Sequence, residues 1–164
     1  MIIGIVAVDR KNAIGKGGEL PWHYSADMKF FRETTTGHAV VMGRKTWLTI
    51  GKPLKDRLNI VLSRDSNIEP QDSLLVLSDV DSVISFNNSL TTDLFVIGGA
   101  QIYQAFLPHI EKWIITEVPL TVSGADVFMP EGYLEGFKVV DSKPLGDGLT
   151  VKFYEPRKAK STND

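Results

Sequence analysis

A single carboxylate, Asp27, lies within the apolar part of a predicted helix, and it is the strongest chemical signal in the sequence. In the segment PWHYSADMKFFR, Ser25 is a suitable N-cap, which places Asp27 in the first turn of the helix. At helical spacing Asp27 shares one face with Phe30, Phe31 and Thr34. Burying an acid in an apolar face costs free energy, so either Asp27 does chemistry or it only complements the helix dipole. The segment alone leaves both interpretations open.

A turn after the second predicted strand has the features of an anion site. The strand ends at Gly43, and the following helix opens with Arg44, Lys45 and Thr46. Free backbone N–H groups at the start of a helix favour an anion, and the two cations strengthen that field. Because basic residues at this end oppose the helix dipole, their placement favours an anionic ligand over a merely solvated basic pair.

A second glycine turn, Gly98-Gly99, lies between a predicted strand and a predicted helix. Glycines there let the backbone approach a ligand closely, although the pattern is not the G-x-G-x-x-G fingerprint and could be only a tight turn. Paired with the Arg44 turn on a parallel sheet, it predicts pyrophosphate binding at the carboxyl ends of the strands. Ser63 and Arg64 follow a third strand, and Arg44 with Arg64 could hold an additional phosphate, which favours NADP over NAD.

Short apolar runs alternate with helical patterns over the first two thirds of the chain, and these elements must position the residues above. Strands are predicted at Ile2–Val8, Ala39–Met42, Leu58–Leu62, Leu74–Leu77 and Leu94–Ile97. Helices are predicted around Asp27, at Arg44–Ile50, at Asp79–Phe86 capped by Ser78 or Asp79, and after Gly99 to about Leu107.

The last third has predicted strands without helices between them, at Trp113–Val118, Phe137–Asp141 and Leu149–Tyr154. Gly146-Asp147-Gly148 supplies a turn between the last two strands. We therefore expect an α/β fold with a mostly parallel central sheet, helices on both faces, and an antiparallel C-terminal edge.

The composition is that of an ordinary globular protein and excludes several classes of function. With 164 residues, 43% hydrophobic and 23% charged, we expect one domain over residues 1–157 and a disordered polar tail at 158–164. A net charge of −2 gives no sign of nucleic-acid or membrane-surface binding. There is no cysteine, and the three histidines lack ligand spacing, so no metal is expected.

The first residues, Met1–Val8, are apolar but short, so they are interpreted as a buried strand rather than a signal peptide. No stretch approaches the roughly 20 apolar residues of a membrane span. The expectation is therefore a monomer in the cytoplasm. Gly15-Lys16-Gly17 lacks the spacing and the trailing hydroxyl of a Walker motif, which disfavours phosphoryl transfer.

With these residues identified, nearly the whole chain, from Met1 to about Arg157, resembles the bacterial dihydrofolate reductases. The resemblance rests on ordered motifs, namely Ala7-Val8-Asp9, Ile14-Gly15, Leu20-Pro21-Trp22, Ala26-Asp27-Met28, Met42-Gly43-Arg44-Lys45-Thr46-Trp47, Ile97-Gly98-Gly99 and Ile115-Thr116. Each motif is weak alone, but their order and spacing together are specific. The resemblance implies reduction of 7,8-dihydrofolate to tetrahydrofolate by hydride transfer from NADPH, in support of one-carbon metabolism and thymidylate synthesis. It also implies binding of antifolate-type inhibitors.

The resemblance assigns three residues to catalysis: Asp27 holds the pteridine and supports protonation at N5, Thr116 hydrogen-bonds that carboxylate, and Trp22 positions an ordered water. It implies a substrate slot lined by Ile5, Val6, Ala7, Met28, Phe31, Ile50, Leu54, Ile97 and Tyr103. Arg57, with Lys52 nearby, would bind the glutamyl tail, and a planar arginine suits a carboxylate better than a lysine does. An aspartate walled by Met28 and phenylalanines should have a raised pKa from desolvation.

For the cofactor, the resemblance implies nicotinamide contacts from Ala7, Ile14, Gly15 and Leu20, with Gly15–Leu20 as a mobile loop. The adenosine phosphates would contact the turn at Gly43 and the side chains of Arg44, Lys45, Thr46, Ser63 and Arg64. The pyrophosphate and the neighbouring ribose would lie against Ile97, Gly98, Gly99, Ala100, Gln101, Ile102 and Tyr103.

Three positions depart from the pattern of the family. Ser25 replaces a common proline, and Lys52 replaces a common arginine near the substrate tail. The loop Gly124-Ala125-Asp126-Val127 has one extra residue and a valine in place of threonine. In the family this loop braces the mobile one, so these changes bear on loop closure.

Two other functions compete with this interpretation. A reductase of the same fold, acting on a pyrimidine intermediate of riboflavin synthesis, would share the nucleotide turns. It would not need the Asp27–Thr116 pair or Arg57, and this sequence has all three. A non-enzymatic nucleotide-binding module would have no use for an acid inside an apolar slot.

Overall fold

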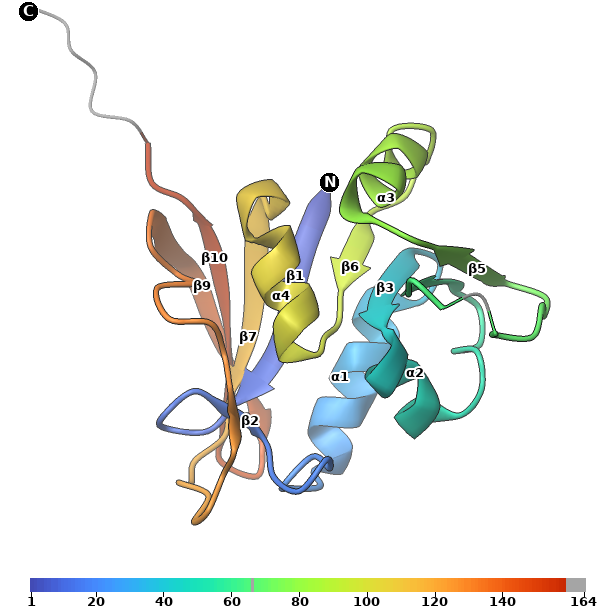
Figure 1. Cartoon of the computed structure of the whole chain (residues 1–164). Helices are drawn as coiled ribbons and strands as arrows, with labels where there is room; N and C mark the ends of the chain where they lie inside the picture. The colour runs from blue at the N-terminus through green and yellow to red at the C-terminus, as the bar shows by residue number, and fades with distance from the viewer. Residues whose placement is uncertain (66, 159–164) are drawn as a thin grey trace, which may run out of the picture.

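The computed structural model describes residues 1–65 and 67–158, and its centre is a sheet that is mostly parallel (Figure 1). The strands are β1 (Ile2–Val8), β2 (Ala13–Gly15), β3 (Ala39–Gly43), β4 (Leu58–Leu62), β5 (Leu74–Leu77), β6 (Leu94–Val96), β7 (Lys112–Glu117), β8 (Val127–Phe128), β9 (Phe137–Gly146) and β10 (Leu149–Pro156). The helices are α1 (Ser25–Thr35), α2 (Arg44–Ile50), α3 (Val80–Asn87) and α4 (Ala100–Phe106), followed by a 3₁₀ helix at Leu107–His109.

Within the described residues, eight strands form the main sheet in the order β5-β4-β3-β6-β1-β7-β10-β9. The pairs from β5 to β7 are parallel, whereas β10 is antiparallel to β7 and to β9. β2 and β8 form a separate small antiparallel pair. This arrangement confirms the predicted α/β class and its antiparallel C-terminal edge.

The helices cover both faces of the sheet, and β1 shows why. Its successive side chains point to opposite faces, so Ile3 and Ile5 pack with side chains from α1 and α2. Ile2 and Val8 pack instead with side chains from α3 and α4. A strand buried on both faces has no polar side, which accounts for the unbroken apolar runs in the sequence.

The start of α1 differs from the prediction. Ser25 was expected to cap the helix, but the helix begins at Ser25 and the N-cap position belongs to Tyr24, with no capping side chain. The Tyr24 carbonyl accepts from the Met28 N–H at 3.2 Å, so the first hydrogen bond lies one residue earlier than the hydroxyl implied. Asp27 still lies in the first turn. At α3 the predicted Asp79 cap is confirmed, with its carboxylate accepting from the Ser82 N–H at 2.7 Å.

Other differences concern the ends of elements. Strand β9 extends to Gly146, five residues beyond the predicted end, and the Gly146–Gly148 turn joins it to β10 as expected. The helix predicted to about Leu107 continues after Phe106 as a 3₁₀ turn that contains Pro108. The predicted tail disorder falls on residues 159–164, which lie outside the described residues. Within the part of the chain that the structure describes, no helix is long and apolar enough to span a membrane.

Candidate active site

The two glycine turns that the sequence singled out lie against each other. β3 and β6 are neighbouring parallel strands, so their carboxyl ends meet at one edge of the sheet, towards the bottom of Figure 1. There the Gly43 N–H donates to the Gly98 carbonyl at 2.9 Å. A Cβ built on Gly43 would lie 2.8 Å from Ile102 Cγ1, so a side chain at this position would force the two turns apart. The starts of α2 and α4 therefore lie side by side, with their first N–H groups at the same edge of the sheet.

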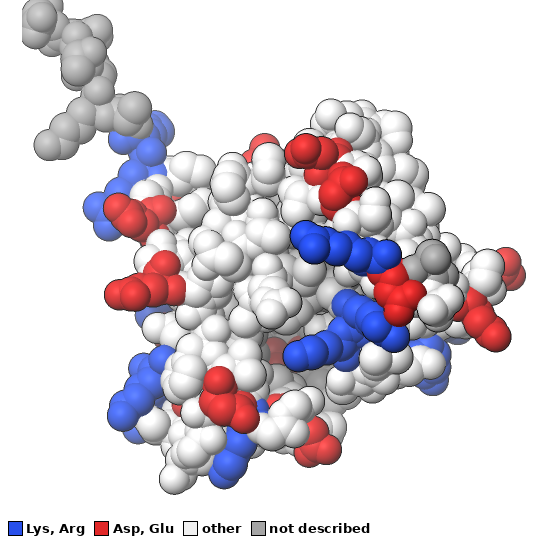
Figure 2. Space-filling model, viewed as in Figure 1, with Lys and Arg blue, Asp and Glu red and all other residues white. Residues whose placement is uncertain are grey.

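Basic side chains stand beside this edge, on the face shown in Figure 2. Arg44 is half exposed and pairs with Asp65, with its Nη1 3.2 Å from Oδ2. Ser63 Oγ hydrogen-bonds the backbone of the same Asp65 at 3.1 Å. Next to them is a cavity of about 220 Å³, lined by Ser63, Arg64, Val76, Leu77, Ser78 and Ser82. The structure thus brings Arg64 to a hollow at the carboxyl ends of β4 and β5, on the same edge of the sheet as the glycine turns.

Asp27 is positioned by three elements. It lies in the first turn of α1, while Ala7 on β1 is paired with Thr116 on β7. Partial burial raises the pKa of the Asp27 carboxyl above its ordinary value, and a hydrogen bond from the Thr116 hydroxyl offsets part of that rise. Thr116 itself is buried. A half-buried acid with a raised pKa holds its proton more readily than an exposed aspartate, so it can exchange that proton with a ligand.

The indole of Trp22 lies under the loop that precedes α1. The side chain is buried against Val118 and Leu149, and its Nε1–H has no hydrogen-bond partner among the described protein atoms. An unpartnered buried donor costs about 1–3 kcal/mol, so this N–H marks a place where a ligand atom or a water would be held.

Most of the predicted substrate-slot residues fall into one apolar cluster between the sheet and the helices α1 and α2. Its members from the predicted set are Ile5, Phe31, Ile50, Leu54 and Ile97. Two other predicted site residues have large apolar side chains that are exposed, Met28 at 55% and Leu20 at 57%. The Val6 side chain, also predicted to line the slot, packs into the cluster on the opposite face of the sheet.

Tyr103 connects the slot to the second glycine turn. Its hydroxyl donates to the Ile5 carbonyl at 2.7 Å, and a Cβ built on Gly98 would lie 3.3 Å from its ring. Complete burial raises the pKa of the phenol, so it stays protonated. Tyr103 therefore holds the middle of β1 against the Gly98-Gly99 turn. Ile14 and Ile102 pack on this same face.

Arg57 is buried without a carboxylate partner. Its Nη1 donates to Thr35 Oγ1 and its Nε to the Lys55 carbonyl, both at 3.0 Å, and its guanidinium lies 5.9 Å from the Phe31 ring centre. Burial lowers the pKa of this guanidinium from its ordinary value. Among the described residues no Asp or Glu forms an ion pair with it. Such a charge is well placed for a carboxylate ligand. Lys52, also predicted here, is exposed.

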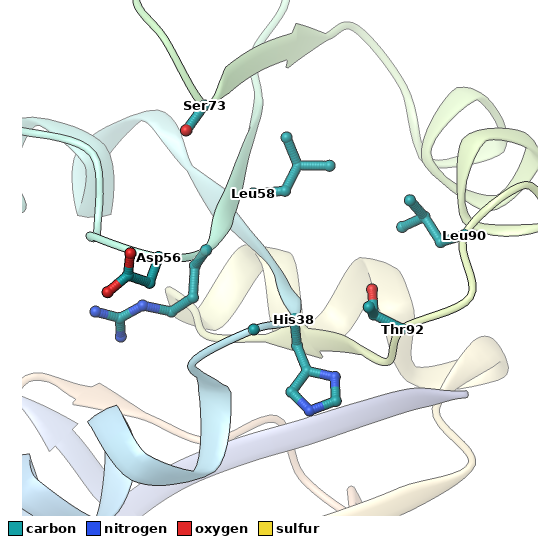
Figure 3. Close-up of a pocket in the computed structure, with 8 residues that line it drawn as sticks. His38, Asp56, Leu58, Ser73, Leu90 and Thr92 are labelled. Atoms are coloured by element: carbon teal, nitrogen blue, oxygen red, sulfur yellow. The ribbon is translucent and has the colours of Figure 1, made fainter.

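Arg57 also borders a second cavity of about 340 Å³ at the amino end of the parallel strands (Figure 3). Figure 3 shows Asp56, Leu58, Leu90 and Thr92 around this space. Apart from Arg57, no predicted site residue lines this cavity. Asp27 does not line it.

The glycine-rich loop is closed by its own backbone and touches a second loop. Lys16 and Glu19 exchange two backbone hydrogen bonds of 3.0 and 3.1 Å. Asp126, in the loop with one extra residue, accepts from the Gly17 N–H at 3.1 Å, and its own N–H donates to the Gly15 carbonyl at 3.1 Å. The altered loop thus still contacts Gly15 and Gly17.

Sequence reasoning missed Thr35, whose hydroxyl accepts from Arg57 and donates to the Phe31 carbonyl at 2.8 Å. The available signal was its position four residues after Phe31 on the slot face of α1. It also missed the role of Asp9 as a hydrogen-bond acceptor at the end of β1.

Comparison with known proteins gives one family. The family model described as dihydrofolate reductase matches residues 1–153. The chain is 38% identical over 136 residues to a dihydrofolate reductase from Staphylococcus haemolyticus, covering 83% of this chain and 80% of that protein. It is 34% identical over 159 residues to one from Haemophilus influenzae, covering 97% and 89%. A solved dihydrofolate reductase from Enterococcus faecalis, complexed with NADP(H) and RAB-propyl, superimposes with a TM-score of 0.88 at 27% identity, covering 96% of this chain and 97% of that one.

Proposed function

The chain belongs to the dihydrofolate reductase family, and we propose that it reduces 7,8-dihydrofolate to 5,6,7,8-tetrahydrofolate with NADPH. The observation that carries this proposal is the half-buried Asp27 on α1, hydrogen-bonded by Thr116 and placed beside an apolar cluster. Helix α1 packs on the same sheet that carries the two abutting glycine turns. The product would serve one-carbon metabolism and thymidylate synthesis.

The residues at the glycine turns fit a dinucleotide. Gly43 leaves room that a Cβ would fill, and the Gly98-Gly99 turn exposes backbone rather than side chains. Arg44, Lys45, Thr46, Ser63 and Arg64 would hold the adenosine phosphates, and the cavity beside Arg64 supports a further phosphate, hence NADPH. Residues 97–103 would hold the pyrophosphate and ribose, and Ala7, Ile14, Gly15 and Leu20 would contact the nicotinamide. When bound, NADPH supplies the hydride that is transferred to pteridine C6.

The protein's own chemistry is the handling of one proton. Because the pKa of Asp27 is raised, the carboxyl stays protonated to a higher pH than an ordinary aspartate does, which suits it to proton transfer. Asp27 would hydrogen-bond the pteridine and support protonation at N5, and Thr116 would fix the orientation of the carboxylate. The free Trp22 Nε1–H would position a water that relays this proton.

The apolar cluster and the buried arginine would orient the substrate. Ile5, Phe31, Ile50, Leu54 and Ile97 form one wall on which the pteridine and the aromatic ring of the substrate would pack. Arg57 has three further N–H groups to offer a glutamyl carboxylate, and Lys52 would add a second, exposed cation. Antifolates that mimic the pteridine would occupy the same slot. The remaining predictions, a single domain over residues 1–157 that acts as a monomer without nucleic acid or membrane partners, belong to this proposal.

The test is loss of NADPH absorbance on addition of dihydrofolate, with NADH in parallel. We expect NADPH-selective turnover, and we expect Asp27→Asn to bind NADPH while kcat at neutral pH falls about 10²–10⁴-fold. The matched control is Glu33→Gln, which removes an exposed acid from the other side of α1. Normal turnover in Asp27→Asn would remove this acid from the mechanism. NADPH binding without turnover in the parent enzyme would point to another substrate.

A further inference from the structure

The Asp9 carboxylate, directly after β1, is buried and accepts three backbone hydrogen bonds. The donors are the N–H groups of Lys11 and Ala13 at 2.8 Å and of Val122 at 2.9 Å. Only 4% of the residue is exposed. These hydrogen bonds hold the pKa of the carboxyl below its ordinary value despite its burial. Asp9 is therefore charged wherever the enzyme works.

The three donors belong to two different segments. Lys11 and Ala13 lie in the turn from β1 into β2, whereas Val122 lies in the segment after β7. Two backbone hydrogen bonds also join these segments, from Val118 N–H to the Val8 carbonyl at 2.8 Å and, in the opposite direction, from Arg10 N–H to the Leu120 carbonyl at 3.0 Å. Asp9 is the side chain that joins the two segments at this end.

A second carboxylate joins the same two regions further along. Asp126 accepts from Gly17, but this contact is exposed, whereas the Asp9 contacts are buried. The root of the glycine-rich loop is thus fixed in the protein interior while its tip is held at the surface. Few buried contacts hold the tip, so the tip can move while the root stays in place.

We infer that Asp9 is a positioning residue for the nicotinamide side of the cofactor site, acting through the turn that it holds together. This inference rests on the proposed function. The nicotinamide contacts proposed above lie on both sides of Asp9 in the chain, Ala7 before it and Ile14 and Gly15 after it. The adenosine contacts come from β3, β4 and α2, which Asp9 does not touch. Loosening the Asp9 turn should therefore weaken one half of the cofactor site and spare the other.

Asp9→Asn separates the two sets of hydrogen bonds. Lys11 and Ala13 both donate to Oδ1 and Val122 donates to Oδ2, so an asparagine can keep its oxygen on the local turn. Its amide N–H would then face the Val122 N–H, so the side-chain link between the segments is lost while the two backbone hydrogen bonds remain. The expected result is a fivefold or greater rise in Kd for NADPH, with the Kd for 2′,5′-ADP, which lacks the nicotinamide half, changed less than twofold. The KM for dihydrofolate at saturating NADPH should also change less than twofold.

Glu111→Ala is the matched control, because the Glu111 carboxylate accepts the Ile2 N–H at 2.7 Å at the opposite end of β1. It should lower thermal stability without changing either Kd. If the ratio of the two Kd values in Asp9→Asn equals that of the parent enzyme, Asp9 is merely structural and the inference is wrong. If Asp9→Asn fails to fold, Asp9→Ser takes its place, because serine can accept from the local turn but cannot reach Val122. Asp9→Ser must then raise the Kd for NADPH and leave the Kd for 2′,5′-ADP nearly unchanged. Both Kd values are measured without turnover, so they remain decisive even if dihydrofolate is not the substrate.

Discussion

The buried guanidinium of Arg57 predicts a large effect on substrate binding and a small effect on stability. The Arg57→Met variant should bind substrate much more weakly than the parent. The free variant should nevertheless be about as stable as the free parent. The reason is that Arg57 carries a desolvated charge with no ion-pair partner among the described residues. A residue kept for stability would be paired or replaced by an apolar side chain of similar volume.

The magnitudes follow from its contacts. Methionine removes the hydrogen bonds to Thr35 and to the Lys55 carbonyl, worth about 1 kcal/mol each net. It also removes the desolvation cost of the charge, which opposes that loss. We therefore expect the unfolding free energy to change by no more than about 1 kcal/mol. Removing one partner of a desolvated arginine–carboxylate pair costs about 2–4 kcal/mol in the complex, or a roughly 30- to 1000-fold rise in KM.

The assay compares dihydrofolate with a 6-methyl-dihydropterin that lacks the glutamyl tail, at saturating NADPH, and urea unfolding of the free protein. For Arg57→Met the KM should rise for dihydrofolate only, with kcat little changed. Lys55→Met removes an exposed cation two residues away and controls for net charge. Equal KM changes for both substrates, or a loss of stability above 3 kcal/mol, would refute this account of Arg57.

Three further outcomes can be measured. Because the pKa of Asp27 is higher in the folded state than in the unfolded state, the stability of the parent falls as pH rises from the unfolded to the folded pKa. In urea unfolding, Asp27→Asn should therefore be more stable than the parent at pH 7, and this gain should vanish in acid. Asp65 pairs with half-exposed Arg44 at 3.2 Å, so Asp65→Asn should free that cation. Fluorescence titration should show that Asp65→Asn lowers the Kd for NADPH about two- to fivefold and leaves the Kd for NADH unchanged. Arg44→Ala should weaken the binding of NADPH far more than that of NADH. Tyr103→Phe removes the buried 2.7 Å bond to the Ile5 carbonyl and should cost about 1–2 kcal/mol in thermal unfolding, and an unchanged melting temperature would show that the bond contributes nothing.

The sequence predicted those parts of the fold that local patterns determine. Strands buried on both faces appear as apolar runs, and the glycine turns follow them, so β1, β3, β4 and β6 were found with nearly correct ends. β2 and β8 were missed because segments of three and two residues have no periodicity of their own. They form only because distant segments meet, which no local pattern records.

The same reasoning explains which parts of the site could be predicted. Asp27 was found because an acid on an apolar helical face is a local anomaly. By contrast, Thr35, which orients Arg57, lies 22 residues away from it in sequence, and the Val122 donor lies 113 residues from Asp9. Local patterns do not record such distant pairs. Ser25 was taken as a cap because its residue type is suitable, but a hydroxyl cannot by itself determine where the first helical hydrogen bond forms.

The two halves of the proposed cofactor site are built differently, and this has a consequence for how substitutions act. The adenosine half consists of backbone and side chains at the ends of buried strands. Contacts such as the hydrogen bond from the Gly43 N–H to the Gly98 carbonyl hold it together. The nicotinamide half comes from the end of β1, the short strand β2 and the glycine-rich loop, which are held by the carboxylates of Asp9 and Asp126. Changes in the rigid half should alter affinity for NADPH and for its adenosine fragment together, since both depend on the same contacts. Changes at the loop carboxylates should separate the two affinities, because only the nicotinamide depends on where the loop lies.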